Sequence, residues 1–262
     1  MVLLTALLSQ RQRTCVHSAA PSPHRLLSAS SIGDTRAILN DQPVDALIID
    51  PLIDTAVESL GEFIRIGVDF PCLPVVFYVA RPVEAIKIVV RFPAREHCQV
   101  VVMGVDDRTE TLQDVIGSVV SSSWAGRVLR ALGVEAGKAP NALNDALRLV
   151  FAQPRFFHSA DDVAMRAYMS RRTLDRWLSR FGLVPTGELL HVARAMLALR
   201  LRRDIVVSPD RIRATCGIGG ETTIDEFVSH ILGSTHRQLE AARDVDIDSF
   251  VDCFLRRRVE PR

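Results

Sequence analysis

The sequence predicts an α/β doubly wound domain followed by an all-α domain that contains two helix-turn-helix units. Three observations support this fold class. In the first half of the chain, continuous apolar runs alternate with helical patterns. A segment with Gly and Pro interrupts the pattern near residue 135, and strong helix-capping residues follow it. A length of 262 residues allows each domain to bury a core of its own.

Four short apolar runs, and a weaker segment at residues 24–28 with only Leu26 and Leu27 apolar, predict the strands of the first domain. The runs are continuous rather than alternating, which is typical of strands that helices cover on both faces. The predicted strands are residues 2–8, 24–28, 45–50, 74–79 and 99–103.

Helical patterns fill the segments between these runs. The segment 11–23, rich in Ser, Ala and Pro, predicts a poor first helix. Asp107 with Glu110 three residues later predicts the cap of a long last helix. The predicted helices are residues 35–40, 57–66, 82–92 and 111–133.

A segment with Gly137 and Pro140 marks the predicted boundary between the domains. The C-terminal tail is expected to form a short amphipathic helix that docks on the second domain, although its arginines could instead assist phosphate binding. The predicted divisions are residues 1–133 for the α/β domain, 134–140 for the linker, 141–240 for the second domain and 241–262 for the tail.

The second domain begins with a predicted helix-turn-helix at residues 158–185. Ser159, with Asp162 three positions on, predicts the start of its first helix, and Ser170 predicts the start of its second. In the second helix, apolar residues at spacings i, i+3, i+4 and i+7 predict a buried face. These residues are Leu174, Trp177, Leu178 and Phe181.

The opposite face of this helix is cationic, since a step of about 100° per residue places charged side chains there. Between residues 155 and 204, ten arginines stand against five acids, a local balance of +5, whereas the whole chain has a net charge of +1. The expected outward residues are Arg172, Asp175, Arg176, Ser179 and Arg180, with Arg171 at the boundary.

A long helix at residues 188–203 leads into a second predicted helix-turn-helix at residues 208–239. Ser208 followed by Pro209 predicts its first helix, and a Gly-rich turn follows at residues 217–220. From residue 208 to 240, three arginines stand against five acids, a balance of −2, and acids repel phosphate. Its second helix is expected to bury Ile224, Phe227, Val228 and Ile231 and to expose Thr222, Thr223, Asp225, Glu226, Ser229 and His230.

Residues 140–240 resemble the DNA-binding domain of AraC-type transcription regulators, in which a long helix joins two helix-turn-helix units. The segments 159–164 and 170–174 support this resemblance, together with Arg176. The resemblance implies that double-stranded DNA is the partner and that the first unit reads sequence in the major groove.

The second unit departs from the family pattern. The family commonly has arginine at the position of Glu226 and proline at that of His236. The residues expected to contact DNA are Ser170, Arg171, Arg172, Thr173 and Arg176 at the first recognition helix, Arg180 and Arg194 nearer phosphates, and Thr222 and Thr223 in the second unit.

The order of elements in the first domain resembles the receiver domain of bacterial response regulators, and Asp50 lies where that family has its phosphoaspartate. Phosphoryl transfer there needs an acidic pair after the first strand, a hydroxyl after the fourth and a lysine after the fifth. The corresponding segments, 8–10, 79–81 and 104–105, lack these groups. Asp50 is therefore predicted to cap the following turn and to remain unphosphorylated, in a receiver-like domain without a phosphotransfer pocket.

Composition and motifs argue against several other classes of protein. The seven histidines show no metal-ligand spacing, and no Walker loop, GxGxxG or GxSxG occurs, so no metal, cofactor or enzymatic activity is predicted. The five widely spaced cysteines form no CxxC pair, which favours reduced thiols in the cytoplasm. The apolar opening run is too short for a membrane span, so no membrane association is predicted.

These observations predict a sequence-specific DNA-binding transcription regulator in the cytoplasm. A homodimer is expected because dimers suit paired half-sites, and the first domain could also bind a protein partner. Nearly all the positive charge is guanidinium, which suits phosphate and guanine contacts but is equally explained by genomic base composition. The alternatives are a protein-interaction adaptor whose DNA-binding domain no longer reads sequence, and a phosphotransfer protein that signals through Asp50.

Overall fold

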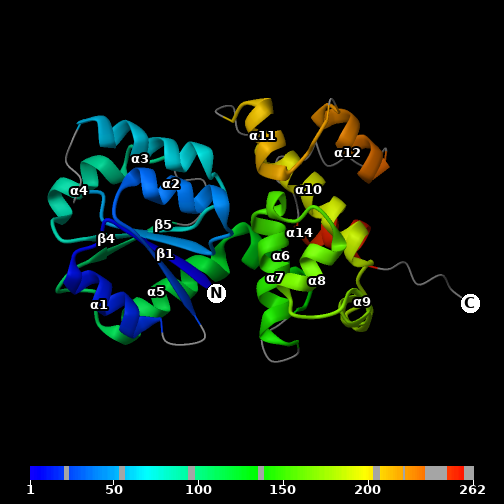
Figure 1. Cartoon of the computed structure of the whole chain (residues 1–262), viewed down its shortest axis with the longest axis horizontal. Helices are drawn as coiled ribbons and strands as arrows, with labels where there is room; N and C mark the ends of the chain where they lie inside the picture. Colours follow the sequence, from blue (N-terminus) through cyan, green and yellow to red (C-terminus); the bar gives the residue numbers. More distant parts are fainter. Residues whose placement is uncertain are drawn as a thin grey trace, which may run out of the picture. The chain divides into compact units, whose positions relative to one another are not determined.

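The computed structural model divides the chain into two compact units, Met1–Trp124 and Ala125–Arg262 (Figure 1). Parts of the predicted linker (135–138), of the second predicted helix-turn-helix (234–239, with His236) and of the predicted tail (241–246 and 257–262) lie outside the described residues. The structure describes residues 1–20, 24–52, 57–93, 98–134, 139–202, 207–220, 222–233 and 247–256.

The first unit is built on a five-stranded parallel sheet with the strand order β2-β1-β3-β4-β5. The three central strands are buried along their whole length, which explains their continuous apolar sequences. The five predicted strands are confirmed as β1 (Val2–Ala6), β2 (Arg25–Ala29), β3 (Ala46–Ile49), β4 (Val75–Val79) and β5 (Cys98–Val102).

Helices cover both faces of this sheet (Figure 1): α1 (Gln10–Ala19), α2 (Ile32–Asp41), α3 (Val57–Asp69), α4 (Pro82–Val89) and α5 (Thr109–Ser122). One apolar cluster joins strand residues such as Leu47 and Phe77 to α2, α3 and α4. A second cluster joins the intervening residues, such as Ile48 and Tyr78, to α1 and α5. The alternation follows from the strand geometry, in which successive side chains point to opposite faces.

The first helix is regular, so the expectation of a poor helix was wrong. The Ser9 hydroxyl accepts a hydrogen bond from the N–H of Gln12 (3.3 Å), and the Gln12 side chain accepts one from the N–H of Ser9 (2.8 Å). This reciprocal capping box fixes the start of α1, and the burial of Val16 and Ala19 holds the helix on the sheet.

The long helix expected over residues 111–133 is two helices, α5 and α6 (Trp124–Ala131), with a break at Ser123. The Ser123 hydroxyl donates to the carbonyl of Val120 (2.7 Å). Local bonds of this kind compete with the helical backbone ladder, and a run of serines at this place therefore favours an interruption.

The expected cap at Asp107 was also wrong. α5 begins after Arg108, which provides no side-chain cap. The Asp107 carboxylate instead accepts a hydrogen bond from the Tyr78 hydroxyl (3.1 Å). Burial raises the pKa of the Tyr78 phenol, so the phenol keeps its proton and remains the donor.

The second unit contains α6 and further helices: α7 (Asn141–Ala152), the 3₁₀ turn η1 (Pro154–Phe156), α8 (Ala160–Arg166), α9 (Arg171–Arg180), α10 (Thr186–Arg202), α11 (Pro209–Cys216), α12 (Ile224–Leu232), α14 (Ile247–Phe250) and the π-helical turn η3 (Val251–Leu255). The long predicted helix is confirmed as α10, which packs against α7, α8, α9, α11 and α12. Most of its residues are buried, and a helix that is buried on most sides lies at the centre of its unit.

The C-terminal segment docks on the second unit, as expected for the part that the structure describes. Phe250 and Leu255 are fully buried. The N–H of Val184 donates to the carbonyl of Leu255 (3.0 Å), and Leu183 pairs with Arg256 in an antiparallel bridge. The segment thus covers the chain between α9 and α10.

In the part of the chain that the structure describes, no helix is long and apolar enough to cross a membrane. The five cysteines, all of which are described, form no disulfide. The described histidines, cysteines and carboxylates form no cluster of three or more that could hold a metal ion.

Candidate nucleic-acid interface

The helix pair α8 and α9 begins at two capped N-termini. The Ser159 hydroxyl accepts a hydrogen bond from the N–H of Asp162 (3.2 Å), whose carboxylate accepts one from the N–H of Ser159 (2.9 Å). Ser170 accepts a bond from the N–H of Thr173 (3.2 Å), and the two hydroxyl oxygens lie 2.9 Å apart. Both predicted caps are confirmed, and they fix the first turn of each helix.

α9 buries Leu174 and Leu178 completely and exposes arginines on the opposite side. Arg172 and Arg176 are four residues apart, so their side chains lie next to each other on one helix face. Among the residues that the structure describes, neither has an ion-pair or hydrogen-bond partner. Both guanidinium groups are therefore available to an acceptor outside the chain.

Asp175 does not point outward as expected. Its Oδ1 accepts hydrogen bonds from the N–H (2.9 Å) and the hydroxyl (2.6 Å) of Thr186, the first residue of α10. Its Oδ2 lies 3.9 Å from Nε of Arg171. Asp175 thus fastens α9 to the start of α10 and removes a negative charge from the outward face.

The expected burial of Trp177 and Phe181 is only partial. Both side chains are half-buried, and their rings stack with centroids 6.3 Å apart. The Arg180 guanidinium lies 4.8 Å from the centroid of the Trp177 ring. A cation–π contact at an exposed site contributes about 0.5–1 kcal/mol, which is enough to favour one orientation of Arg180.

Two exposed apolar side chains lie near the end of α8, Met165 in its last turn and Tyr168 in the turn that leads to α9. Met165 is 71% exposed and Tyr168 is 87% exposed. Tyr168 has a φ of 52°, in the left-handed region that residues with a Cβ rarely adopt. The sequence predicted a break at this place, but nothing in it indicated the backbone conformation of Tyr168.

Arg194, expected near phosphates, is 9% exposed, so that prediction was wrong. Its guanidinium donates a hydrogen bond to the carbonyl of Phe157, in the segment before α8. Burial lowers the pKa of this guanidinium. The Arg194 side chain therefore has a structural position inside the unit, joining α10 to the start of α8.

The second helix pair, α11 and α12, presents a different surface. Thr223 and Glu226 form a capping box, in which the N–H (2.8 Å) and the hydroxyl (2.9 Å) of Thr223 donate to the Glu226 carboxylate. These bonds lower the pKa of Glu226. Asp225 pairs with Arg202 of α10, and Thr222 is exposed. The Thr223 hydroxyl is thus already engaged, and the exposed start of α12 is acidic.

Asp50 is 1% exposed and lies at the carboxyl end of β3. Its Oδ1 accepts a hydrogen bond from the N–H of Leu52 (3.0 Å), which confirms the predicted turn cap. Its Oδ2 accepts one from the side-chain amide of Gln12 (2.9 Å), which also donates to the carbonyl of Tyr78 (2.6 Å). Sequence reasoning missed Gln12, because only the fold brings α1 beside the ends of β3 and β4.

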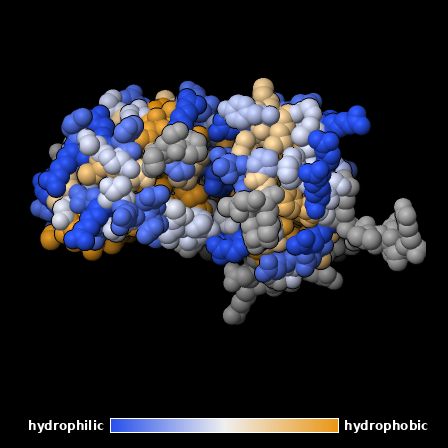
Figure 2. All heavy atoms as spheres, turned by 90° about the horizontal axis from the view of Figure 1, so that it is seen from below, coloured by the Kyte–Doolittle hydropathy of each residue, from blue (hydrophilic) through white to orange (hydrophobic). Residues whose placement is uncertain are grey.

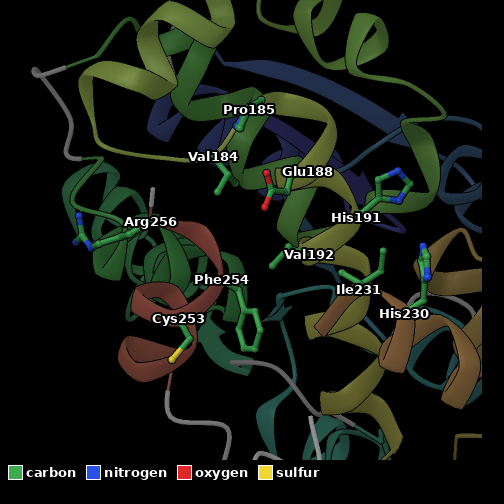
Figure 3. A pocket seen from close by; sticks show the side chains of 10 residues that line it. All are labelled: Val184, Pro185, Glu188, His191, Val192, His230, Ile231, Cys253, Phe254 and Arg256. Atoms are coloured by element: carbon green, nitrogen blue, oxygen red, sulfur yellow. The ribbon is translucent and has the colours of Figure 1, made fainter. Parts of the chain in front are cut away.

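A groove of about 690 Å³ lies within the second unit, between α10, α12 and the C-terminal segment (Figure 3). Val192, Ile231 and Phe254 give it apolar walls, with His191 and His230 beside them (Figure 3). Burial, followed by the charges of Arg194 and His230, lowers the pKa of His191. Glu188 and Arg256 also line the groove, so both signs of charge are present there, in contrast to the face of α9.

No family model, curated protein or solved structure matches this chain. The assignment of function therefore depends on the geometry and charge of the described residues.

Proposed function

We propose that the chain is a sequence-specific DNA-binding transcription regulator in which α8 and α9 form a helix-turn-helix. The observation that supports this proposal best is the pair Arg172 and Arg176. These arginines are exposed on a helix that Leu174 and Leu178 anchor to the rest of the unit. Guanidinium groups donate in a fork that matches guanine O6 and N7 as well as phosphate oxygens.

The dimensions of α9 suit this role. With side chains a helix is about 10–12 Å in diameter, and the major groove of B-DNA is about 12 Å wide and admits a helix. The first turn of a recognition helix commonly contacts base edges, which gives Ser170, Arg171 and Thr173 places near the bases or the adjacent phosphates. Arg180, at the other end of α9, is proposed as a phosphate contact.

The second pair, α11 and α12, is proposed to position the protein rather than to read bases. Asp225 and Glu226 are exposed at the start of α12, where their charges disfavour phosphate. Thr222 is the remaining exposed candidate for a contact, since the Thr223 hydroxyl already bonds Glu226. Sequence reading would then depend mainly on α9.

The first unit is proposed to be a receiver-like domain that serves association instead of phosphotransfer. The buried Asp50 carboxylate already accepts bonds from Gln12 and Leu52, which leaves little space for a phosphoryl group. We propose that this unit forms a homodimer in the cytoplasm, which would place two α9 helices on paired half-sites.

The first prediction tests base reading by α9. After the preferred duplex has been selected from a random library, Arg172→Ala and Arg176→Ala should each reduce discrimination against substituted duplexes by about 1–3 kcal/mol. An arginine that contacts only phosphate would instead weaken all duplexes alike and lower the salt slope by about one unit. Fluorescence anisotropy across several salt concentrations measures both quantities.

Arg65→Ala, which removes an exposed arginine from α3, is the matched control and should change neither quantity. Thr223→Ala should lower the free energy of unfolding by about 1 kcal/mol, because the helix cap is lost. It should nevertheless reduce discrimination between duplexes less than either arginine change in α9. If no duplex is enriched, or if Thr223→Ala costs more discrimination than both arginine changes, reading by α9 is wrong. A protein-interaction adaptor, which the exposed apolar residues of the first unit favour, would then be the better assignment.

A further inference from the structure

The outward face of α4 carries a stripe of apolar side chains. Val83, Ile86 and Val90 are 74%, 60% and 73% exposed. Their spacings of three and four residues place them along one helix face. Ala85 and Ile88 point the other way, into the core beneath the helix. α4 lies at the left end of the first unit in Figure 1, and apolar residues reach the surface at the same end in Figure 2.

Two further exposed valines follow on the neighbouring strand. β5 is an edge strand of the sheet, and its Val100 is 49% exposed. Cys98 and Val102, two residues away on either side, pack on the cluster that α4 covers, so Val100 lies on the same face of the sheet as α4. Val105, just after the strand, is 70% exposed. Val100 adds to the exposed apolar surface on this face of the sheet, and such a surface commonly marks an interaction site.

Charged residues border the stripe on one side only. With a step of about 100° per residue, Glu84 and Lys87 fall on the same flank of the stripe, and Arg91 follows in the turn after α4. All three are exposed, and none has an ion-pair partner among the residues that the structure describes. Along the chain the order of charge is negative, positive, positive.

This order of charge is self-complementary when two copies of α4 lie antiparallel. A two-fold axis between antiparallel helices brings the same flank of each helix together, as in antiparallel coiled coils. The midpoint of the stripe lies between Ile86 and Lys87, so Val83 of one copy faces Val90 of the other. Glu84 of one copy then lies between Lys87 and Arg91 of the other. In a parallel arrangement, the charged flank of each copy would instead face the uncharged flank of the other, so these charges would not pair.

We propose that α4 packs antiparallel against α4 of a second copy of this chain and forms the homodimer interface. The inference rests on the homodimer proposed above and names its surface. A stable interface buries about 1,200–2,000 Å² in total, whereas two short helices with the edge valines cover less. The dimer is therefore weak, with dissociation in the micromolar range, and two DNA half-sites would strengthen it.

Charge exchange on the full-length protein tests the arrangement without DNA. Glu84→Lys makes every flank charge positive, and the double change Lys87→Glu with Arg91→Glu makes every flank charge negative. Sedimentation should show the unaltered protein dimerising, and each variant alone should dissociate at least about tenfold more readily. An equimolar mixture of the two variants should recover the dimer, because opposite flanks then meet.

Arg13→Glu on α1, on the other face of the sheet, is the matched charge reversal and should leave the dimer intact. The proposal is overturned if the unaltered protein is monomeric at high micromolar concentration. It is also overturned if both variants dimerise normally, or if their mixture stays monomeric although each variant has a native circular dichroism spectrum. Failure to bind DNA would overturn the proposed function but leave these sedimentation results unaffected.

Discussion

Tyr168 combines a left-handed backbone with an exposed side chain. It directly follows Ala167, the C-cap of α8, at the position where helices commonly have glycine. A left-handed conformation costs a residue with a Cβ about 1–2 kcal/mol, and an 87% exposed ring makes few contacts that offset this cost. The residue is therefore strained where the two helices of the pair meet.

Tyr168→Gly should raise the free energy of unfolding by up to about 1 kcal/mol, since relief of the strain exceeds the added entropy of glycine in the unfolded chain. Urea unfolding followed by tryptophan fluorescence measures the change, because Trp177 lies in the adjoining helix. Tyr168→Ala removes the same ring but keeps the penalty, so it should bring no such gain. Equal midpoints for the two variants would contradict the role of backbone strain.

Single residues were predictable from the sequence where local rules decide them. The exposure of Arg172 and Arg176 followed from helical periodicity, and the Ser170 cap from its position. Asp175 and Arg194 were misplaced because their partners, Thr186 and the Phe157 carbonyl, lie 11 and 37 residues away. The position of Glu226 could have been predicted from the sequence. Thr223, three positions before it, forms with it the same capping-box pattern as Ser159 with Asp162.

Gly217 decides how α11 ends. Its φ of 68° lies in the left-handed region, and a Cβ there would come within 2.9 Å of the Cα of Arg155 in η1. Two neighbouring glycines allow the effect of the positive φ to be distinguished from the effect of the close contact with Arg155. Gly220 has a φ of 74° but open space around it, and Gly219 has open space and an ordinary φ.

The three alanine variants should therefore form a graded series. Gly219→Ala should change the free energy of unfolding by less than about 0.5 kcal/mol, and Gly220→Ala should lower it by about 1 kcal/mol. Gly217→Ala should lower it further, because the backbone of η1 must also move. Denaturant midpoints measure the series. A Gly217→Ala loss no larger than that of Gly220→Ala would show that the close approach to Arg155 has no energetic consequence.

Whole elements were predicted best where one pattern dominates. Four of the five strands followed from continuous apolar runs, whereas β2 has only a short apolar segment, and α11 followed from Ser208 with Pro209. Errors arose where two signals compete. Ser9 and Gln12 start α1 although the composition of the segment is poor for a helix, and the bond from Ser123 to the Val120 carbonyl interrupts an otherwise continuous helical pattern.

At the scale of the whole molecule, charge and apolar surface are distributed unequally between the two units. The exposed arginines of α9 lie in the second unit, whereas the exposed stripe of α4 lies in the first. The net charge of the whole chain, +1, does not reveal this difference between the units. If the first unit associates and the second reads DNA, binding to paired sites depends on both surfaces at once.

The last prediction concerns this dependence. Duplexes with one and with two copies of the selected site, about 10–10.5 base pairs apart from centre to centre, separate the two contributions. The unaltered protein should bind the two-site duplex cooperatively, since a bound neighbour raises the effective concentration of the second copy. Glu84→Lys should bind the one-site duplex nearly as the unaltered protein does, yet lose the cooperativity.

An equimolar mixture of Glu84→Lys with the doubly acidic variant of α4 should restore cooperativity, and Arg13→Glu should leave it unchanged. The added charge could change DNA affinity directly, and salt would screen that effect. The affinity for the one-site duplex measures this change, so that it can be subtracted from the two-site result. Arg172→Ala should have the opposite signature, because it weakens both duplexes while dimerisation persists. Cooperative binding by Glu84→Lys would place the association surface elsewhere. Loss of one-site binding in that variant would show that the two surfaces are not separate.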